Sequence, residues 1–272
     1  RLRVAARHLS AVQATHTNPT PRLGGIAIFG ALAASLAFAP NGAFVMYSQT
    51  LLAASFLFSA GLLEDMELGI SPRMRLLAAC LASLVAIWMT GTWLPRSDIP
   101  GLDFLMTHWA IGVPMTVLVT AGAANSFNLI DGINGLAAMT SIIASVALGV
   151  IAHQAGFVEM AYLAAMLAAC TFGFFLANYP SGRIFLGDAG AYATGHIIAW
   201  LGIILMSRVP SVSGFSILLI LFWPVAETGF TITRRRILKL PSDTPDRLHF
   251  HHLVARSLGI FFRKKAADNV LT

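Results

Sequence analysis

Charged residues are scarce in this 272-residue chain. Asp, Glu, Lys and Arg together make up 11% of it and hydrophobic residues 57%, and the mean hydropathy is +0.74. In soluble globular domains about a quarter of the residues are charged. The shortage of charge therefore excludes an ordinary soluble domain and predicts a membrane protein.

Cysteine is also rare. The two cysteines, Cys80 and Cys170, lie in separate apolar runs, where they behave as small hydrophobic residues. This argues against a disulfide scaffold and against a cysteine metal site. The apolar runs also show none of the alternation that a membrane barrel requires, so the spanning elements are expected to be helices.

Apolar windows of nearly helix-spanning length recur eight times along the chain. A transmembrane helix needs about 20 such residues. The windows cover residues 24–39, 44–63, 76–93, 109–124, 136–152, 160–177, 189–206 and 214–233. We therefore predict an all-α polytopic membrane protein with about eight transmembrane helices, in a single domain that covers residues 1–272.

Basic residues indicate the orientation, because connections rich in Lys and Arg stay on the cytoplasmic side. If the N-terminal segment is cytoplasmic, the opposite side keeps Arg96 and Arg208. The cytoplasmic side receives Arg1, Arg3, Arg7, Arg22, Arg73, Arg75, Arg183, Arg234, Arg235, Arg236, Lys239 and Arg247. The net charge of +6 therefore reflects mainly the orientation of the chain in the membrane. In the second place, it would attract anionic headgroups or phosphorylated substrates.

Four polar stretches fall on that cytoplasmic side, although an uncompensated polar group is costly beside a membrane. They are LLEDMELG, NSFNLIDGINGL, NYPSGRIFLGDAG and DTPDRLHFHH. The connections on the other side carry nothing comparable. We therefore expect an active site at the cytoplasmic face, built by segments that are far apart in the chain.

Each stretch also has a plainer interpretation. Glu64 and Asp65 fit a solvated helix end, and Asp131 and Asp188 fit ordinary helix N-caps. The glycine-rich helix starts DGINGL and GDAGAYATG would instead expose backbone N–H groups and a positive dipole end, which favour phosphate. Two such starts on one face suit a diphosphate.

Asn128 and Asp188 offer hard oxygen donors of the kind that Mg²⁺ prefers. Mg²⁺ needs few protein ligands besides water and phosphate oxygens. A divalent ion facing a diphosphate then suggests phosphoryl transfer.

The histidine segment HFHH leaves two interpretations open. His249, His251 and His252 suit the binding of phosphate oxygens and the binding of a metal equally well, since their spacing is not that of a helical zinc pair. His196 and Glu227 lie within apolar windows, where an ionisable side chain has a function or pairs helices. For Glu227, pairing at the interface with the basic run that follows is a sufficient account.

Five motifs in order resemble the polyprenyl-phosphate N-acetylhexosamine-1-phosphate transferases, or glycosyltransferase family 4. Members of this family begin the synthesis of the lipid-linked precursors of peptidoglycan, teichoic acid, the O-antigen of lipopolysaccharide and N-glycans. PTPRLGG resembles its first cytoplasmic motif, GLLEDMELGISPRMRLLAA its acidic-pair loop and NSFNLIDGINGL its Asn/Asp-rich loop. GRIFLGDAGAY resembles its metal-binding segment and DRLHFHH its histidine motif. The resemblance covers nearly the whole chain.

The resemblance implies a role for each matching residue. Asp188 would be the principal magnesium ligand, with Asn128 beside it. Phe185 would lie against the uracil ring of a UDP-sugar, and Asn134 would hydrogen-bond that base. The other residues implied in nucleotide-sugar binding are Asn125, Arg183, Arg247, His249, His251 and His252.

Three acidic residues complete the implied site. Glu64 and Asp65 would position or deprotonate the lipid phosphate, and Asp131 would be a further catalytic carboxylate. The sequence departs from the common bacterial pattern where Glu64 and Asn134 each replace an aspartate. The comparison with the family pattern also suggests that the first helix and part of the last are missing.

The implied reaction transfers N-acetylhexosamine 1-phosphate from a UDP-sugar to polyprenyl phosphate, with release of UMP. Undecaprenyl phosphate in a bacterial inner membrane is the expected acceptor, Mg²⁺ the expected cofactor with Mn²⁺ as its substitute, and a homodimer the expected assembly, without nucleic acid. The alternative is a membrane transporter of an anionic phosphorylated metabolite, against which the two halves of the chain show no convincing repeat. A histidine-box metalloenzyme would need several histidine clusters, and the sequence has one.

Overall fold

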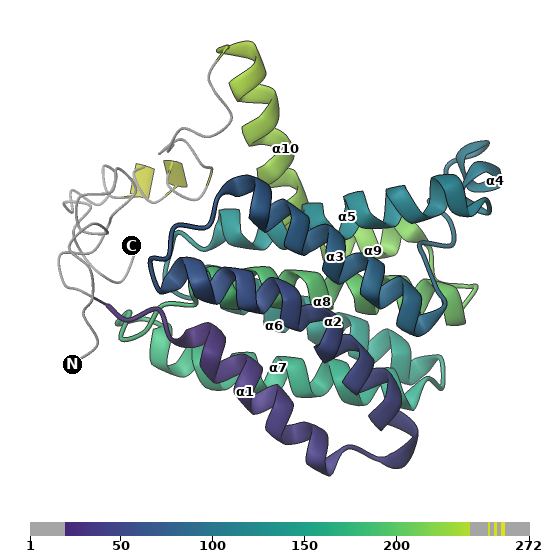
Figure 1. Cartoon of the computed structure of the whole chain (residues 1–272), viewed down its shortest axis with the longest axis horizontal. Coiled ribbons are helices and arrows are strands. Elements are labelled where there is room, and N and C mark those ends of the chain that lie inside the picture. The colour runs from purple at the N-terminus through teal and green to yellow at the C-terminus, as the bar shows by residue number, and fades with distance from the viewer. Residues whose placement is uncertain (1–19, 240–249, 251–252, 255–256, 259–272) are drawn as a thin grey trace.

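The computed structural model describes residues 20–239, 250, 253–254 and 257–258. All regular structure in this part of the chain is helical (Figure 1). In chain order the elements are α1 (Gly24–Ser35), η2 (Leu36–Phe38), α2 (Asn41–Asp65), α3 (Pro72–Thr90), α4 (Leu102–Met106), α5 (Trp109–Ile130), α6 (Leu136–Gln154), α7 (Val158–Asn178), α8 (Gly187–Arg208), α9 (Gly214–Ile220) and α10 (Phe222–Ile237). The predicted all-α class is therefore confirmed.

The expected count of eight spans is not confirmed. Among the described residues, 6 helices are long and apolar enough to cross a membrane, or 7 if α9 and α10 count as one span. The first apolar window forms a shorter helix, Gly24–Phe38, and the last is bent by 81° between α9 and α10. Pro224 accounts for the break, because it has no N–H to donate to the carbonyl of Ile220 four residues earlier.

The apolar segments nevertheless alternate in direction, as the charge pattern predicted. The end of α2 and the start of α8 meet, since the backbone N–H of Asp188 donates to Asp65. The start of α1 joins them, since Gly24 donates to the carbonyl of Phe185. The starts of α1 and α8 and the end of α2 therefore share one end of the bundle, with long helices running side by side away from it (Figure 1).

Helix α8 is the centre of the bundle. Its hydrophobic window is buried along its whole length, whereas no more than 44% of the window is buried in the other five long spans. It packs against α1, α2, α5, α6 and α7, and small residues allow this close approach. A β-carbon on Gly61 of α2 would lie 2.5 Å from the backbone nitrogen of Ala189. The tight packing places the first turn of α8 among the ends of its neighbours.

Arg96 holds the opposite end of the bundle together. Its guanidinium donates to the carbonyls of Met206, Pro210 and Val212, just where α8 ends. A cation at a helix C-terminus also compensates the negative end of the helix dipole. Asp98, which accepts a bond from Arg96, accepts a second from Ser213 at the start of α9. Arg96 therefore has a structural role, because it holds the segment that follows α8 against the end of that helix.

Candidate active site

Asp65 caps the helix that carries Asp188. Its two carboxylate oxygens accept the backbone N–H groups of Asp188 and Ala189, both at 2.9 Å. Its side chain is 3% exposed, and Arg22 lies 3.5 Å away. The residue before α8 is Leu186, whose apolar side chain cannot cap a helix. Asp65 therefore supplies the cap from another helix, and the N-cap interpretation of Asp188 is wrong.

Asp188 itself faces the basic and amide groups of two neighbouring helices. Its Oδ2 lies 3.2 Å from Nη1 of Arg75 on α3, and its Oδ1 accepts from Nδ2 of Asn128 on α5 at 3.0 Å. Tyr192, one turn further along α8, donates to Oδ1 of Asn128 at 3.4 Å. The predicted pair of Asn128 and Asp188 is thus brought together. The sequence reasoning used Arg75 for topology alone and missed it as a site residue.

The donor set suits a magnesium ion. Among the described residues, no three His, Cys, Asp or Glu side chains form a group that could hold a metal. Mg²⁺ nevertheless usually takes one or two carboxylates and completes its shell with water and substrate phosphates. Asp188 and Asn128 meet that need, provided that the Asn128 amide turns its oxygen toward the ion.

Asp131 lies at the end of α5, in the same cluster of charges. The helix that follows, α6, begins at Leu136 with Gly135 as its N-cap, so the N-cap interpretation of Asp131 is wrong too. Burial raises the pKa of Asp131 to about 7. The positive charge of Arg22 opposes this rise, and the negative charges of Asp188 and Asp65 add to it. Asp131 can therefore exchange a proton near neutral pH.

Glu64, the neighbour of Asp65, shapes its own loop. Its Oε2 accepts the backbone N–H of Ile70 at 2.8 Å, across the turn between α2 and α3. The two acidic residues therefore have different contacts. Asp65 binds the start of α8, and Glu64 binds the backbone of the loop that leads to Arg75. The solvated-end interpretation of the pair is wrong for Asp65, and the predicted contact with a lipid phosphate stays a prediction for Glu64.

The backbone of the first motif, PTPRLGG, is hydrogen-bonded to the backbone of the segment just before Asp188. Phe185 donates its N–H to the carbonyl of Pro21 at 3.0 Å and accepts from Gly24 at 2.9 Å. Gly25 donates to the carbonyl of Leu186 at 2.8 Å. This short ladder places Arg22 beside the carboxylates and leaves the Phe185 ring half-buried. The stacking of that ring on uracil stays a prediction.

Two asparagines shape the loop between α7 and α8. Asn134 is 8% exposed and donates to the carbonyl of Pro180 at 3.3 Å. Asn178 accepts from the backbone N–H of Gly135 at 2.6 Å and donates to the carbonyl of Ile184 at 2.8 Å. The sequence reasoning missed Asn178, because a polar residue at a helix end carries no distinctive signal. Arg183 is exposed on the same loop, and its contact with the nucleotide stays a prediction, as does that of Asn134.

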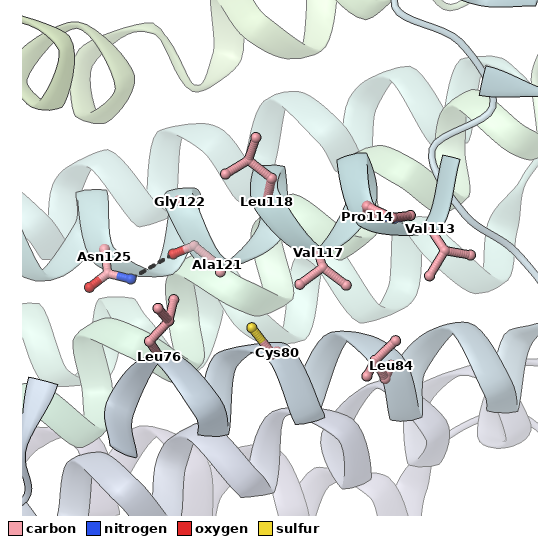
Figure 2. A pocket seen from close by; sticks show the side chains of 10 residues that line it. All are labelled: Leu76, Cys80, Leu84, Val113, Pro114, Val117, Leu118, Ala121, Gly122 and Asn125. Carbon is pink, nitrogen blue, oxygen red and sulfur yellow. Dashed lines mark hydrogen bonds between the residues drawn. The ribbon is translucent and has the colours of Figure 1, made fainter. Parts of the chain in front are cut away.

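A groove runs between α3 and α5, and its polar end is marked by Asn125 (Figure 2). Its volume is about 480 Å³. The lining residues are Leu76, Cys80, Leu84, Val113, Pro114, Val117, Leu118, Ala121, Gly122 and Asn125. Asn125 is exposed and donates back to the carbonyl of Ala121 at 2.8 Å. Asn125 thus lies on the rim of an apolar groove, and its predicted contact with the nucleotide sugar stays a prediction.

The predicted histidine ligands lie outside the described residues. They are His249, His251 and His252, together with Arg247. Phe250, which stands among them in the sequence, is described. Its backbone N–H donates to Oε1 of Glu227 on α10 at 2.9 Å.

Comparison with known proteins connects this arrangement to a family. A family model described as "Glycosyl transferase family 4" matches residues 47–206, more than half of the chain. The chain belongs to glycosyl transferase family 4. This membership confirms the resemblance that the five motifs indicated, and the apolar helices of this family member make it an integral membrane protein.

Relatives that resemble the chain carry related names. The "Probable undecaprenyl-phosphate N-acetylglucosaminyl 1-phosphate transferase" of Bacillus subtilis is 35% identical over 246 residues, which are 87% of this chain and 66% of the relative. The "Phospho-N-acetylmuramoyl-pentapeptide-transferase" of Moorella thermoacetica is 29% identical, over 85% of this chain and 75% of the relative. The "Undecaprenyl-phosphate alpha-N-acetylglucosaminyl 1-phosphate transferase" of Thermotoga maritima is 27% identical, over 90% and 71%. The chain thus spans just under two thirds of the Bacillus relative's length.

Proposed function

We propose that this family 4 glycosyl transferase moves N-acetylhexosamine 1-phosphate from a UDP-sugar to polyprenyl phosphate, releasing UMP. The observation that carries the proposal is the meeting of Asp188 with Arg75 and Asn128 at the converging ends of membrane helices. Two arginines that each pair with a carboxylate suit a site in which the partners change when substrate binds. Phosphates would then pair with the arginines, and a divalent cation would pair with the carboxylate. The names of the relatives support undecaprenyl phosphate as the acceptor.

Arg75 and Arg22 would bind the diphosphate. Each now pairs with a carboxylate, at 3.2 Å and 3.5 Å respectively. A nucleotide diphosphate would offer these guanidinium groups more negative charge than a single carboxylate. Mg²⁺, held by Asp188 and Asn128, would neutralise charge on the diphosphate and on the departing UMP.

An oxygen of the polyprenyl phosphate would attack the phosphorus that is linked to the sugar. A new P–O bond then forms while the bond to the UMP oxygen breaks. A phosphate dianion needs no base for this attack. Asp65 is poorly suited to act as one, because both of its oxygens bind α8. For a lipid phosphate that arrives protonated, Asp131 is the better acceptor, because it lies in the same cluster of charges and burial raises its pKa.

The groove between α3 and α5 would hold the first isoprenoid units of the lipid. Apart from Asn125, its lining is apolar or cysteine, and both helices are candidate membrane spans. Leu76, next in sequence to Arg75, marks the same end of the groove as Asn125 in Figure 2. A lipid lying there would bring its phosphate toward the diphosphate that Arg75 binds. Asn125 would then contact the lipid headgroup rather than the nucleotide.

The reaction would take place at the cytoplasmic face of a bacterial inner membrane. The basic residues of the sequence and the clustering of site residues at one end of the bundle both support that side. The relatives' names make UDP-N-acetylglucosamine the first sugar to test, with Mn²⁺ as a substitute for Mg²⁺ and a homodimer as the assembly to examine.

The proposal is tested by UMP release from a panel of UDP-N-acetylhexosamines, using the detergent-solubilised chain. Release should require the nucleotide sugar, polyprenyl phosphate and Mg²⁺ together, and should vanish in Asp188→Asn. Release that persists in Asp188→Asn would remove Asp188 as the central ligand. Transport of UDP-sugar into proteoliposomes without UMP release would instead support the transporter alternative.

A further inference from the structure

Tyr192 is the last residue of the motif GRIFLGDAGAY, and the proposed reaction gives it no role. It follows Asp188 by four residues in α8, so the two side chains lie on one face of the helix. Its hydroxyl donates to Oδ1 of Asn128 at 3.4 Å. The other end of that amide, Nδ2, donates to Oδ1 of Asp188 at 3.0 Å. The Asn128 amide therefore turns its oxygen toward Tyr192 and its nitrogen toward Asp188.

The ring of Tyr192 is held in place by its neighbours. Its exposed fraction is 4%. It belongs to a cluster of buried residues from α2, α3 and α5, namely Leu57, Ala79, Ala82, Ala121 and Ala124. A buried tyrosine usually keeps a hydrogen-bond partner for its hydroxyl. The packing of the ring therefore holds the hydroxyl beside the Asn128 amide.

A cation bound by Asp188 and Asn128 would need the opposite orientation of that amide. Mg²⁺ takes oxygen ligands, whereas the atom of Asn128 that faces Asp188 is the amide nitrogen. Half a turn about the last side-chain bond exchanges the oxygen and the nitrogen of an asparagine. The nitrogen would then face Tyr192 and would need an acceptor there.

The hydroxyl of Tyr192 can serve both orientations, because a phenol both donates and accepts hydrogen bonds. We propose that Tyr192 is a positioning residue that lets the Asn128 amide turn between Asp188 and a divalent cation. It donates to the amide oxygen when the nitrogen binds Asp188, and it accepts from the nitrogen when the oxygen binds the cation. The inference rests on the proposed function, because it assigns the cation to Asn128 and Asp188.

The two hydrogen bonds differ in strength, which gives the hydroxyl an effect on metal affinity. The bond from Tyr192 to Asn128 is 3.4 Å long, whereas bonds between two oxygens are usually about 2.7–2.8 Å. Little is therefore lost when this bond is removed. An amide whose oxygen binds a cation has a more polarised N–H group, and such a donor makes a stronger hydrogen bond. Removal of the hydroxyl should therefore weaken the binding of the cation.

The test titrates Mn²⁺ alone into the full chain in detergent and follows free Mn²⁺ by electron paramagnetic resonance. Tyr192→Phe should raise the Kd for Mn²⁺ about three- to tenfold, as loss of one hydrogen bond implies. The matched control is Tyr162→Phe, because the Tyr162 hydroxyl donates to the carbonyl of Phe38, also at 3.4 Å, at the other end of the bundle. That control should bind Mn²⁺ like the wild type, and both variants should keep the wild-type melting temperature without metal.

A second background shows whether the hydroxyl acts through the amide. Asn128→Asp keeps an oxygen for the cation but has no N–H group for Tyr192 to accept. Tyr192→Phe should therefore not weaken Mn²⁺ binding in the Asn128→Asp chain. Equal weakening in both backgrounds would overturn the inference. So would a Kd for Mn²⁺ that Tyr192→Phe leaves unchanged, whether or not the melting temperature falls.

Mn²⁺ binding needs no turnover, so it separates this inference from the proposed reaction. Binding that depends on Tyr192, in a chain that releases no UMP, would overturn the reaction and support the positioning role. UMP release with Mn²⁺ binding that does not depend on Tyr192, or with no such binding, would overturn the positioning role alone. A chain that neither binds Mn²⁺ nor releases UMP would overturn both.

Discussion

Asp65 and Asp188 are joined through the backbone rather than through their carboxylates. The N–H of Asp188 donates to Oδ1 of Asp65 at 2.9 Å, and the N–H of Ala189 donates to Oδ2 at the same distance. One acidic residue therefore orients the helix whose first turn presents the other. The two carboxylates have different tasks, although both lie in acidic motifs of the sequence.

Substitutions of Asp65 should accordingly reduce stability and activity together. Asp65→Ala removes the cap of α8 and should lower the free energy of unfolding by about 1 kcal/mol or more. Asp65→Asn keeps one acceptor oxygen and should have a smaller effect on both properties. Thermal melting and UMP release measured on the same preparations check this. A catalytic base would show the opposite pattern, in which Asp65→Asn melts like the wild type but is inactive.

Replacing Arg75 should strengthen the binding of the metal and weaken the binding of the nucleotide sugar. Arg75 competes with a cation for Asp188, since its Nη1 lies 3.2 Å from Oδ2. Arg75→Ala should therefore lower the Mg²⁺ concentration needed for half-maximal activity, while the KM for the UDP-sugar rises about tenfold or more because a charged phosphate contact is lost. The control is Arg73→Ala, which removes an exposed arginine from the same turn of α3. An increased Mg²⁺ requirement in Arg75→Ala would contradict this assignment.

Asp131 should make the stability of the metal-free protein depend on pH. Its pKa in the folded chain is raised from 3.8 to about 7, so the folded state holds the proton more tightly than the unfolded state does. The stabilisation is complete below about pH 4 and is lost as the pH rises through about 7. Melting temperatures of the wild type should fall across this window relative to those of Asp131→Asn.

Addition of Mg²⁺ should move that dependence to lower pH, because a nearby cation favours the ionised carboxylate. Parallel curves of melting temperature against pH for the wild type and Asp131→Asn would show that protonation of Asp131 does not contribute to the stability of the protein.

The approach of α2 to α8 should tolerate no side chain at Gly61. A β-carbon there would meet the backbone of Ala189 at 2.5 Å, so Gly61→Ala should destabilise the protein by about 1–3 kcal/mol. Gly173→Ala on α7 is the matched control, because nothing lies within 4 Å of its β-carbon. The control should be neutral or slightly stabilising. Unfolding in a series of denaturant concentrations measures both, and equal stability of the two variants would contradict the packing argument.

Sequence patterns predicted the helical class, the alternation of the helices and the pairing of Asn128 with Asp188. Those features depend on hydropathy, on charge and on which residues stand at helix ends. The role of Arg75 and the division of labour between Glu64 and Asp65 depend on how each helix is rotated about its axis. That rotation is decided by packing between helices, such as the contact of Gly61 with Ala189, and no single segment encodes it.

The bend near Pro224 is a different case, because its cause stands in the sequence. Counting apolar residues over positions 214–233 predicts one straight span, whereas the missing N–H of one proline divides it into α9 and α10. Length and hydropathy measure how well a segment dissolves in lipid. They do not test whether its hydrogen-bond ladder is continuous.

The complete enclosure of α8 has a consequence for how the protein is made. The helices α1, α2, α5, α6 and α7 that surround it all precede it in the chain. Because synthesis proceeds from the N-terminus, these five neighbouring helices leave the ribosome before α8 does. The helix that carries Asp188 would then be received by partners already in the bilayer, so the active site is completed late in biogenesis.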